Sequence, residues 1–258
     1  MKAFPIVAVL ALVGFAPVQQ TDFEWKGRIE RGRAIEIKGV IGSIRALPAS
    51  GDQVEVTAIK DEGRRGDPDE VTFEVVEHAD GVTICAMYPS DRWDEPNECR
   101  PMRGGRMSTR DNDTEVEFTV HVPSGVNFVG KTVIGDVEAE SLDGDVVART
   151  VNGDVDVSTS GFAEGSTVNG SVYATLGRGD WTGVLEFSTV NGSITVELPD
   201  GIGAEVTAKT VNGGIESDFP VTIRGRFGPR RITGTIGDGG RRLRLETVNG
   251  TIRLRQGR

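Results

Sequence analysis

The residues best suited to chemistry in this sequence are carboxylates at regular spacing. Asp136, Asp145 and Asp154 each follow a glycine at nine-residue intervals, and Asp143 stands two residues before Asp145. Residues two apart on a strand share a face and lie about 6.5–7 Å apart, close to the carboxylate separation used in glycoside cleavage. Asp136, Asp143, Asp145 or Asp154 could therefore serve a polysaccharide-active enzyme. No aromatic platform flanks them, and the alternative reading is that they are turn and strand-edge residues.

Other chemistries have less support. His78 and His121 are the only imidazoles, and no Gly-x-Ser-x-Gly motif is present. With only two His and two Cys, a His/Cys metal cluster is not expected. We therefore expect no catalytic residue, cofactor or metal site, although calcium at the Gly-Asp positions stays open.

The N-terminus predicts export. Lys2 precedes an apolar run from Phe4 to Phe15, and small residues at Gly14 and Ala16 suit a cleavage site. A run of this length fits a signal peptide better than a membrane span. We expect residues 1–20 to be a signal peptide, with an uncleaved anchor or a buried strand as the alternative. The rest of the chain would then act in the periplasm, at the cell surface or as a secreted protein.

Export bears on whether the two cysteines form a disulfide. Cys85 and Cys99 bracket a Pro-containing segment without apolar periodicity. Disulfides form in oxidising compartments, so we expect these residues to be bonded and to pin a loop. The loop would form an excursion at about 85–113.

A repeated tetrapeptide organises the second half of the chain. Thr-Val-Asn-Gly occurs at 150–153, 167–170, 189–192, 210–213 and 247–250, and Thr-Val-Ile-Gly stands at 132–135. Alternating apolar and polar residues follow each copy, as expected of half-buried strands. We predict an all-β, single-stranded parallel β-solenoid of about 20-residue repeats, because stacked corners would let like residues form ladders. The alternative is an antiparallel β-sandwich or meander with Asn-Gly hairpin turns. The predicted structural corners are Asn152, Gly153, Asn169, Gly170, Asn191, Gly192, Asn212, Gly213, Asn249 and Gly250.

The first half continues the strand pattern less regularly. The alternating segments are 34–38, 53–59, 71–76, 82–84 and 115–122. We expect residues 21–258 to form one strand-repeat domain.

Charge is unevenly distributed along the chain, whose formal net charge is −10. Residues 221–258 hold ten Arg and two acidic residues, whereas 111–160 holds eleven acidic and two basic residues. The basic end could bind an anionic envelope polymer, or its Arg side chains could be paired within the fold. Export and the acidic balance argue against nucleic acid as a partner.

The sequence resembles the DUF4097 family of exported, adhesin-like bacterial proteins with β-strand repeats. The resemblance is carried by Phe23-Glu24-Trp25, the segment 35–44, Leu198-Pro199-Asp200-Gly201 and the Thr-Val-Asn-Gly series ending at 245–254. It covers nearly all of the chain after residue 20. Ile134 replaces the usual Asn, and the Cys-containing loop is an elaboration. The resemblance implies an exported repeat-built β fold and supplies no catalytic motif.

We therefore expect a non-enzymatic, adhesin-like scaffold that binds an envelope polymer, a polysaccharide or a surface protein through its repeat surface. A polysaccharide-active enzyme and a self-associating envelope component are the alternatives.

Overall fold

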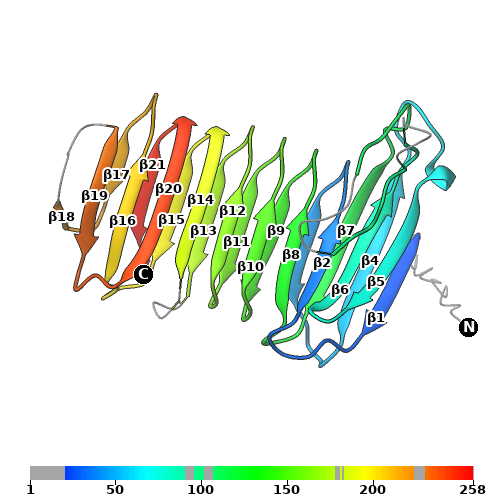
Figure 1. Cartoon of the computed structure of the whole chain (residues 1–258), viewed down its shortest axis with the longest axis horizontal. Helices are drawn as coiled ribbons and strands as arrows, with labels where there is room; N and C mark the ends of the chain where they lie inside the picture. Colours follow the sequence, from blue (N-terminus) through cyan, green and yellow to red (C-terminus); the bar gives the residue numbers. More distant parts are fainter. Residues whose placement is uncertain are drawn as a thin grey trace, which may run out of the picture.

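A computed structural model describes residues 21–90, 96–101, 107–177, 181, 183–223 and 230–257. The predicted signal peptide, residues 1–20, lies outside the described residues. Two large sheets face each other and run along the whole molecule (Figure 1). Sheet A has ten strands and sheet B has eleven.

The strands of sheet A are, in spatial order, β1 (Phe23–Gly27), β4 (Val54–Asp61), β7 (Glu115–Val122), β3 (Ile44–Pro48), β9 (Val137–Leu142), β11 (Val155–Thr159), β13 (Val172–Leu176), β15 (Ile194–Leu198), β21 (Ile252–Gln256) and β17 (Ile215–Ser217). Those of sheet B are β18 (Val221–Ile223), β19 (Arg231–Ile236), β16 (Ala204–Lys209), β20 (Arg241–Asn249), β14 (Val184–Asn191), β12 (Ala163–Ser166), β10 (Val146–Arg149), β8 (Asn127–Lys131), β2 (Ala34–Lys38), β6 (Gly81–Met87) and β5 (Thr72–His78). A short 3-10 helix, η1 (Pro68–Glu70), precedes β5.

The prediction of a single-stranded parallel β-solenoid is wrong. The molecule is sandwich-like, and its two sheets contain both parallel and antiparallel pairs. Strands β20 and β21 come last in the chain, yet they insert between β14 and β16 and between β15 and β17. The alternative of a sandwich is right about the facing sheets, but the central pairs, such as β11 with β13, are parallel.

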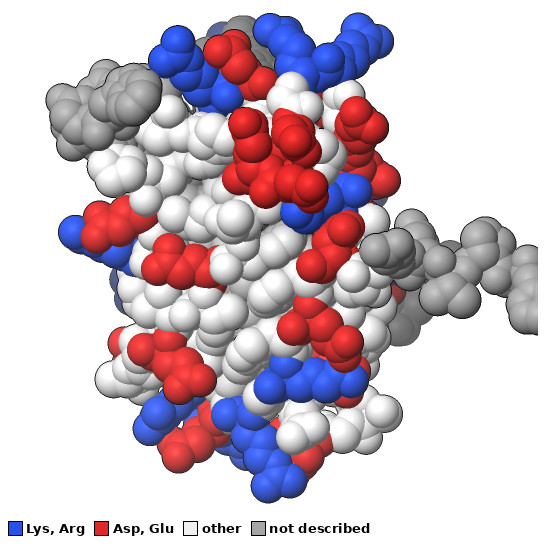
Figure 2. Space-filling model, turned by 90° about the vertical axis from the view of Figure 1, so that its right-hand side faces the viewer, with Lys and Arg blue, Asp and Glu red and all other residues white. Residues whose placement is uncertain are grey.

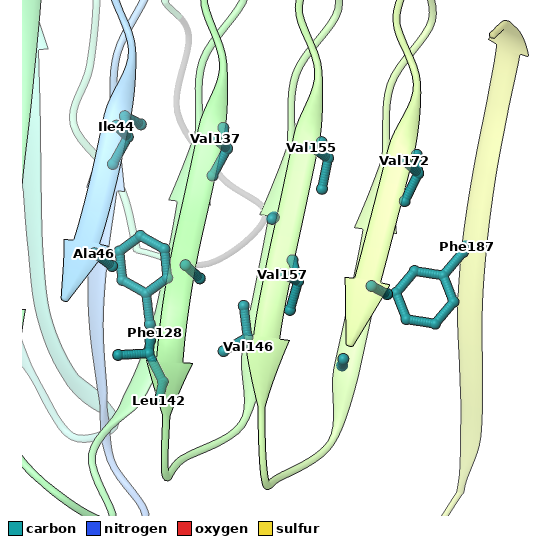
Figure 3. Close-up of a cluster of buried hydrophobic side chains, with 14 of the residues drawn as sticks. Ile44, Ala46, Phe128, Val137, Leu142, Val146, Val155, Val157, Val172 and Phe187 are labelled. Atoms are coloured by element: carbon teal, nitrogen blue, oxygen red, sulfur yellow. The ribbon is translucent and has the colours of Figure 1, made fainter. Parts of the chain in front are cut away.

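The core lies between the sheets and follows from the period-two alternation. Inward residues of most strands are buried, as in the alternating pattern of β7 and β15. Figure 3 shows Val137, Val155 and Val172 side by side, with Phe128 and Phe187 filling the space between the sheets. With few aromatics, small branched side chains fill most of this volume.

The end of the sandwich at β1 and β5 is closed by aromatic rings. Phe23 stacks on Phe73 with ring centroids 4.5 Å apart, and Phe73 meets Phe118 edge-on at 5.9 Å. Figure 2 looks at this end, where positive and negative side chains surround uncharged surface. Charged side chains on edge strands discourage pairing with another sheet.

Each Thr-Val-Asn-Gly copy carries the chain between the sheets, and successive copies stack as rungs. The Thr is buried, and its hydroxyl donates to the carbonyl of the neighbouring rung's Gly, as from Thr167 to Gly153 at 2.8 Å. The Gly is required because the rungs approach closely. A Cβ on Gly170 would lie 2.0 Å from the carbonyl oxygen of Gly153. A side chain at this position therefore forces neighbouring rungs apart.

We predict that Gly170→Ala lowers the free energy of unfolding by roughly 1–3 kcal/mol, because the methyl group meets backbone rather than a movable side chain. Gly214→Ala is the matched control, since a Cβ there meets nothing within 4 Å. Urea unfolding of both variants checks this. Equal stability of the two would contradict the close approach.

Candidate functional site

The carboxylates considered for catalysis instead hold neighbouring rungs together. The Oδ1 atom of Asp136 accepts a hydrogen bond from the Asp154 amide, and that of Asp154 accepts one from the Ser171 amide, both at 2.7 Å. Asp145 accepts from the Phe162 amide at 2.8 Å. Asp143 accepts from the Ser160 hydroxyl at 2.7 Å. Each of the four carboxylates is thus part of the stacking.

In the described part of the chain, no group of three or more His, Cys, Asp or Glu side chains could hold a metal ion.

On the outer face of sheet A, partial desolvation raises the pKa of Asp156, and the charge of Glu140 raises this pKa further. Asp156 faces Glu138 across the β9–β11 pair. Arg45 pairs with Glu138 at 3.6 Å, which limits the negative charge on this face.

Part of the Arg-rich C-terminal segment is paired within the fold, in line with the alternative reading of its charge. Arg253 pairs with Glu216 at 3.2 Å, and Arg255 pairs with Asp218 at 2.9 Å. The late insertion of β20 and β21 causes this, because it places their Arg residues beside acidic residues of earlier strands.

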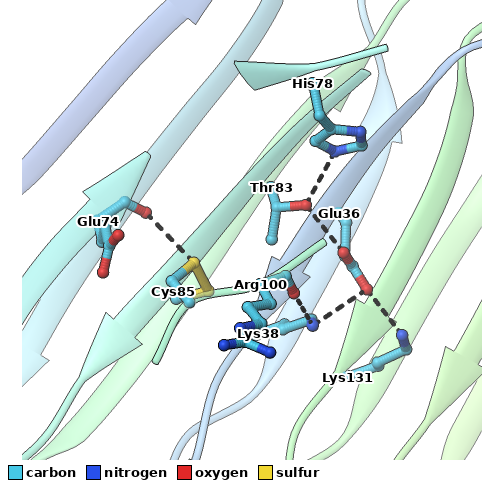
Figure 4. The surroundings of a disulfide bond; sticks show 9 residues. Glu36, Lys38, Glu74, His78, Thr83, Cys85, Arg100 and Lys131 are labelled. Atoms are coloured by element: carbon cyan, nitrogen blue, oxygen red, sulfur yellow. Dashed lines mark hydrogen bonds and ion pairs between the residues drawn. A yellow bond between two sulfur atoms is a disulfide. The ribbon is translucent and has the colours of Figure 1, made fainter. Parts of the chain in front are cut away.

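The predicted disulfide between Cys85 and Cys99 is present, with a Cα–Cα distance of 5.8 Å. Cys85 lies on β6 and Cys99 on the excursion between β6 and β7, whose described residues Cys99 and Arg100 contact β6 and β2. Figure 4 shows a buried polar cluster beside the disulfide.

The described residues contain no helix with the length and apolar character needed to cross a membrane.

Glu36 is the centre of this cluster and is 1% exposed. Its carboxylate meets the ammonium of Lys131 at 2.7 Å and that of Lys38 at 3.7 Å, and it accepts from the Thr83 hydroxyl at 2.9 Å. The Lys38 ammonium also donates to the Arg100 carbonyl at 2.5 Å. Burial lowers the pKa of Lys38, against the opposing effect of Glu36. Sequence reasoning missed this cluster because Glu36 and Lys38 look like ordinary outer residues of a strand.

The surface that most suits binding is the outer face of sheet B where its strands reach the corners. The Val of each tetrapeptide points outward and is between 38% and 44% exposed. We call these residues the valine row; in stacking order they are Val151, Val168, Val190, Val248 and Val211. At about 4.8 Å per rung, the row is about 19 Å long.

The next residue of each tetrapeptide forms a parallel asparagine row. In stacking order its members are Asn152, Asn169, Asn191, Asn249 and Asn212. The Nδ2 of each Asn donates to the Oδ1 of the one before it, at 2.7–2.8 Å. Each amide has two N–H groups and two lone pairs, so hydrogen-bonding capacity remains toward solvent.

Comparison with known proteins gives only remote likenesses. No protein-family model and no curated protein matches the chain. A candidate cell adhesion protein of Clostridium sporogenes aligns over 92% of this chain and 100% of its own, with 12% identity and a TM-score of 0.45. A candidate adhesin of Bacteroides fragilis covers 95% of this chain and 100% of its own, with 12% identity and a TM-score of 0.36. A candidate lipid-binding protein of Parabacteroides distasonis covers 92% and 98%, with 12% identity and a TM-score of 0.20. Likenesses this remote carry no argument about activity, and membership of DUF4097 stays a prediction.

We predict that Glu36→Gln lowers the free energy of unfolding by about 3 kcal/mol, because two largely buried ammonium groups lose their counter-charge. The control is Glu138→Gln, whose side chain is 43% exposed and whose loss costs below about 1 kcal/mol. Chemical denaturation near neutral pH measures both. A Glu36→Gln variant as stable as the control would show that the cluster contributes nothing to stability.

Proposed function

We propose that this chain is an exported, non-enzymatic, adhesin-like scaffold that binds an extended envelope polysaccharide along the valine row. The observation that carries the proposal is the row itself. Single exposed apolar residues are ordinary on protein surfaces, whereas contiguous ones indicate interaction sites. Five valines at one rung spacing form a narrow apolar strip with amides along its side.

The two rows suit a carbohydrate chain chemically. Sugar rings offer apolar C–H faces and hydroxyl groups, which match the valine row and the remaining amide capacity of the asparagine row. Each rung would contribute a weak contact. Linked contacts along one polymer raise the overall affinity through effective concentration.

Two further observations support the export and the non-enzymatic role in this proposal. The Cys85–Cys99 disulfide fits an oxidising compartment outside the cytoplasm. Asp136 and Asp154 are engaged in the rung stacking rather than converging on a cleft, which favours binding over glycoside cleavage.

We expect the double variant Val168→Asp and Val190→Asp to bind washed host envelopes at least about tenfold more weakly, since a valine contact contributes roughly 1.5 kcal/mol or more. Val75→Asp is the matched control, because Val75 is 37% exposed on β5, away from the row. Co-sedimentation across a salt series measures binding, and released sugar is assayed in the same tubes. Unchanged binding by the double variant would overturn the proposal.

The same experiment separates the alternatives. Sugar release by the unmodified chain would replace the scaffold with a polysaccharide-active enzyme. Sedimentation without envelopes that rises with protein concentration would replace it with a self-associating component.

A further inference from the structure

A groove lies in the outer face of sheet B across β14, β20, β16 and β19, with a volume of about 250 Å³. Its polar lining consists of Arg242, Arg244, Glu205, Thr207, Thr233 and Thr235. Strand register brings these side chains together. On the β16–β20 pair, Glu205 is opposite Arg242 and Thr207 is opposite Arg244. On the β16–β19 pair, Glu205 is opposite Thr235 and Thr207 is opposite Thr233.

The backbone beneath the two guanidinium groups is held by a tryptophan. Trp181 is 8% exposed, and its indole N–H donates to the Arg242 carbonyl at 3.4 Å. The guanidinium of Arg241 lies 5.9 Å from the centre of the same ring. Adjacent residues of β20 therefore anchor the strand while Arg242 and Arg244 face outward.

The charge of the groove selects among anions. Arg244 pairs with Glu186 at 3.9 Å, and Glu205 also lines the groove. The guanidinium groups of Arg242 and Arg244 therefore lie among the carboxylates of Glu186 and Glu205. A phosphate group, which carries acceptor oxygens on every side, would be repelled by these carboxylates. A ligand with one carboxylate and several hydroxyl groups fits better. Its carboxylate can meet a guanidinium, and its hydroxyls can donate to Glu205 and exchange hydrogen bonds with the threonines.

We propose that this groove binds a hexuronic acid unit of an acidic polysaccharide. The assignment rests on the proposed function, because the groove shares its face with the valine row. Arg244 stands four residues before Val248 on β20, which is about 13 Å along the strand. One polymer can therefore reach both places.

Binding is tested with oligogalacturonate and with the same oligosaccharide after methyl esterification, using the purified full chain. We expect the acid form to bind with salt sensitivity and the ester to bind at least about tenfold more weakly, as for loss of a charge-assisted hydrogen bond. Arg242→Gln should weaken binding of the acid form similarly. Arg253→Gln, on sheet A, should leave it unchanged.

Equal binding of acid and ester, or stronger displacement by inorganic phosphate than by galacturonate, would overturn the assignment. So would no binding of oligogalacturonate by a chain that still binds envelopes through Val168 and Val190, a result that leaves the proposed function intact.

A second inference comes from the asparagine row. The amide N–H groups of Gly153, Gly170, Gly192 and Gly250 each donate to the Asn carbonyl of the adjacent rung, at 2.9–3.0 Å. Gly213, in the last rung of the stack, has no such bond to any described residue. The side-chain amide of its neighbour Asn212 donates to Asn249 Oδ1, and the Asn212 Oδ1 accepts from no other asparagine side chain of the row.

We infer that Asn212 is the site of spontaneous deamidation in the folded protein. The backbone nitrogen of Gly213 bonds to Cγ of Asn212 and loses its proton, ammonia leaves, and water opens the resulting imide to aspartate or isoaspartate. At the other four copies the Gly amide that would attack is held in a hydrogen bond to the adjacent rung. Deamidation there requires local opening of the stacked rungs.

Peptide mass spectrometry during incubation at mildly alkaline pH should find Asn212 converted several-fold faster than the other four. In urea, where the rungs no longer stack, the deamidation rates of the five asparagines should converge. Equal rates in the folded chain, or faster conversion at an interior Asn, would overturn the inference.

Discussion

Every Thr-Val-Asn-Gly corner depends on a glycine that lies against the carbonyl oxygen of the glycine in the neighbouring rung. A Cβ at Gly153, Gly170 or Gly192 would be within about 2 Å of that oxygen. This contact brings each Thr hydroxyl within reach of the neighbouring Gly carbonyl and sets each Asn amide beside the next. Because all rungs share it, the strands that leave the corners stay in parallel register, and the valines of the corners form one straight row.

The second determinant is the order in which the rungs stack. The rung at 247–250 lies between those at 189–192 and 210–213. This order places the Arg residues of β20 and β21 beside acidic residues of strands that precede them in the chain. It also assembles the groove from four strands, β14, β16, β19 and β20, so the basic segment contributes to a mixed, nearly neutral surface.

Much of the local structure could be predicted from the sequence. Alternation located Ala34–Lys38 and Glu115–Val122 with the bounds that the structure has, because alternate residues of a strand face the core. Stacking order could not be predicted, since corners of identical sequence fit against one another equally well. The buried cluster around Glu36 is built from Thr83 and Lys131, which lie far away in the chain. The tetrapeptide identifies the valines of the row, but it does not show that they face outward while a valine such as Val155, on the strand after the corner, faces the core.

The late insertion of β20 and β21 has a consequence for synthesis. A ribosome delivers β16 and β17 before the strands that separate them from β14 and β15 in the finished sheets. Until Arg241–Gln256 emerges, the growing chain must either leave a layer open or pair β16 with β14 and later exchange that partner. Shortening the chain before Arg241 would therefore remove an interior layer rather than trim an end. For this architecture, strands translated after β16 and β17 complete an interior layer near one end of the sandwich.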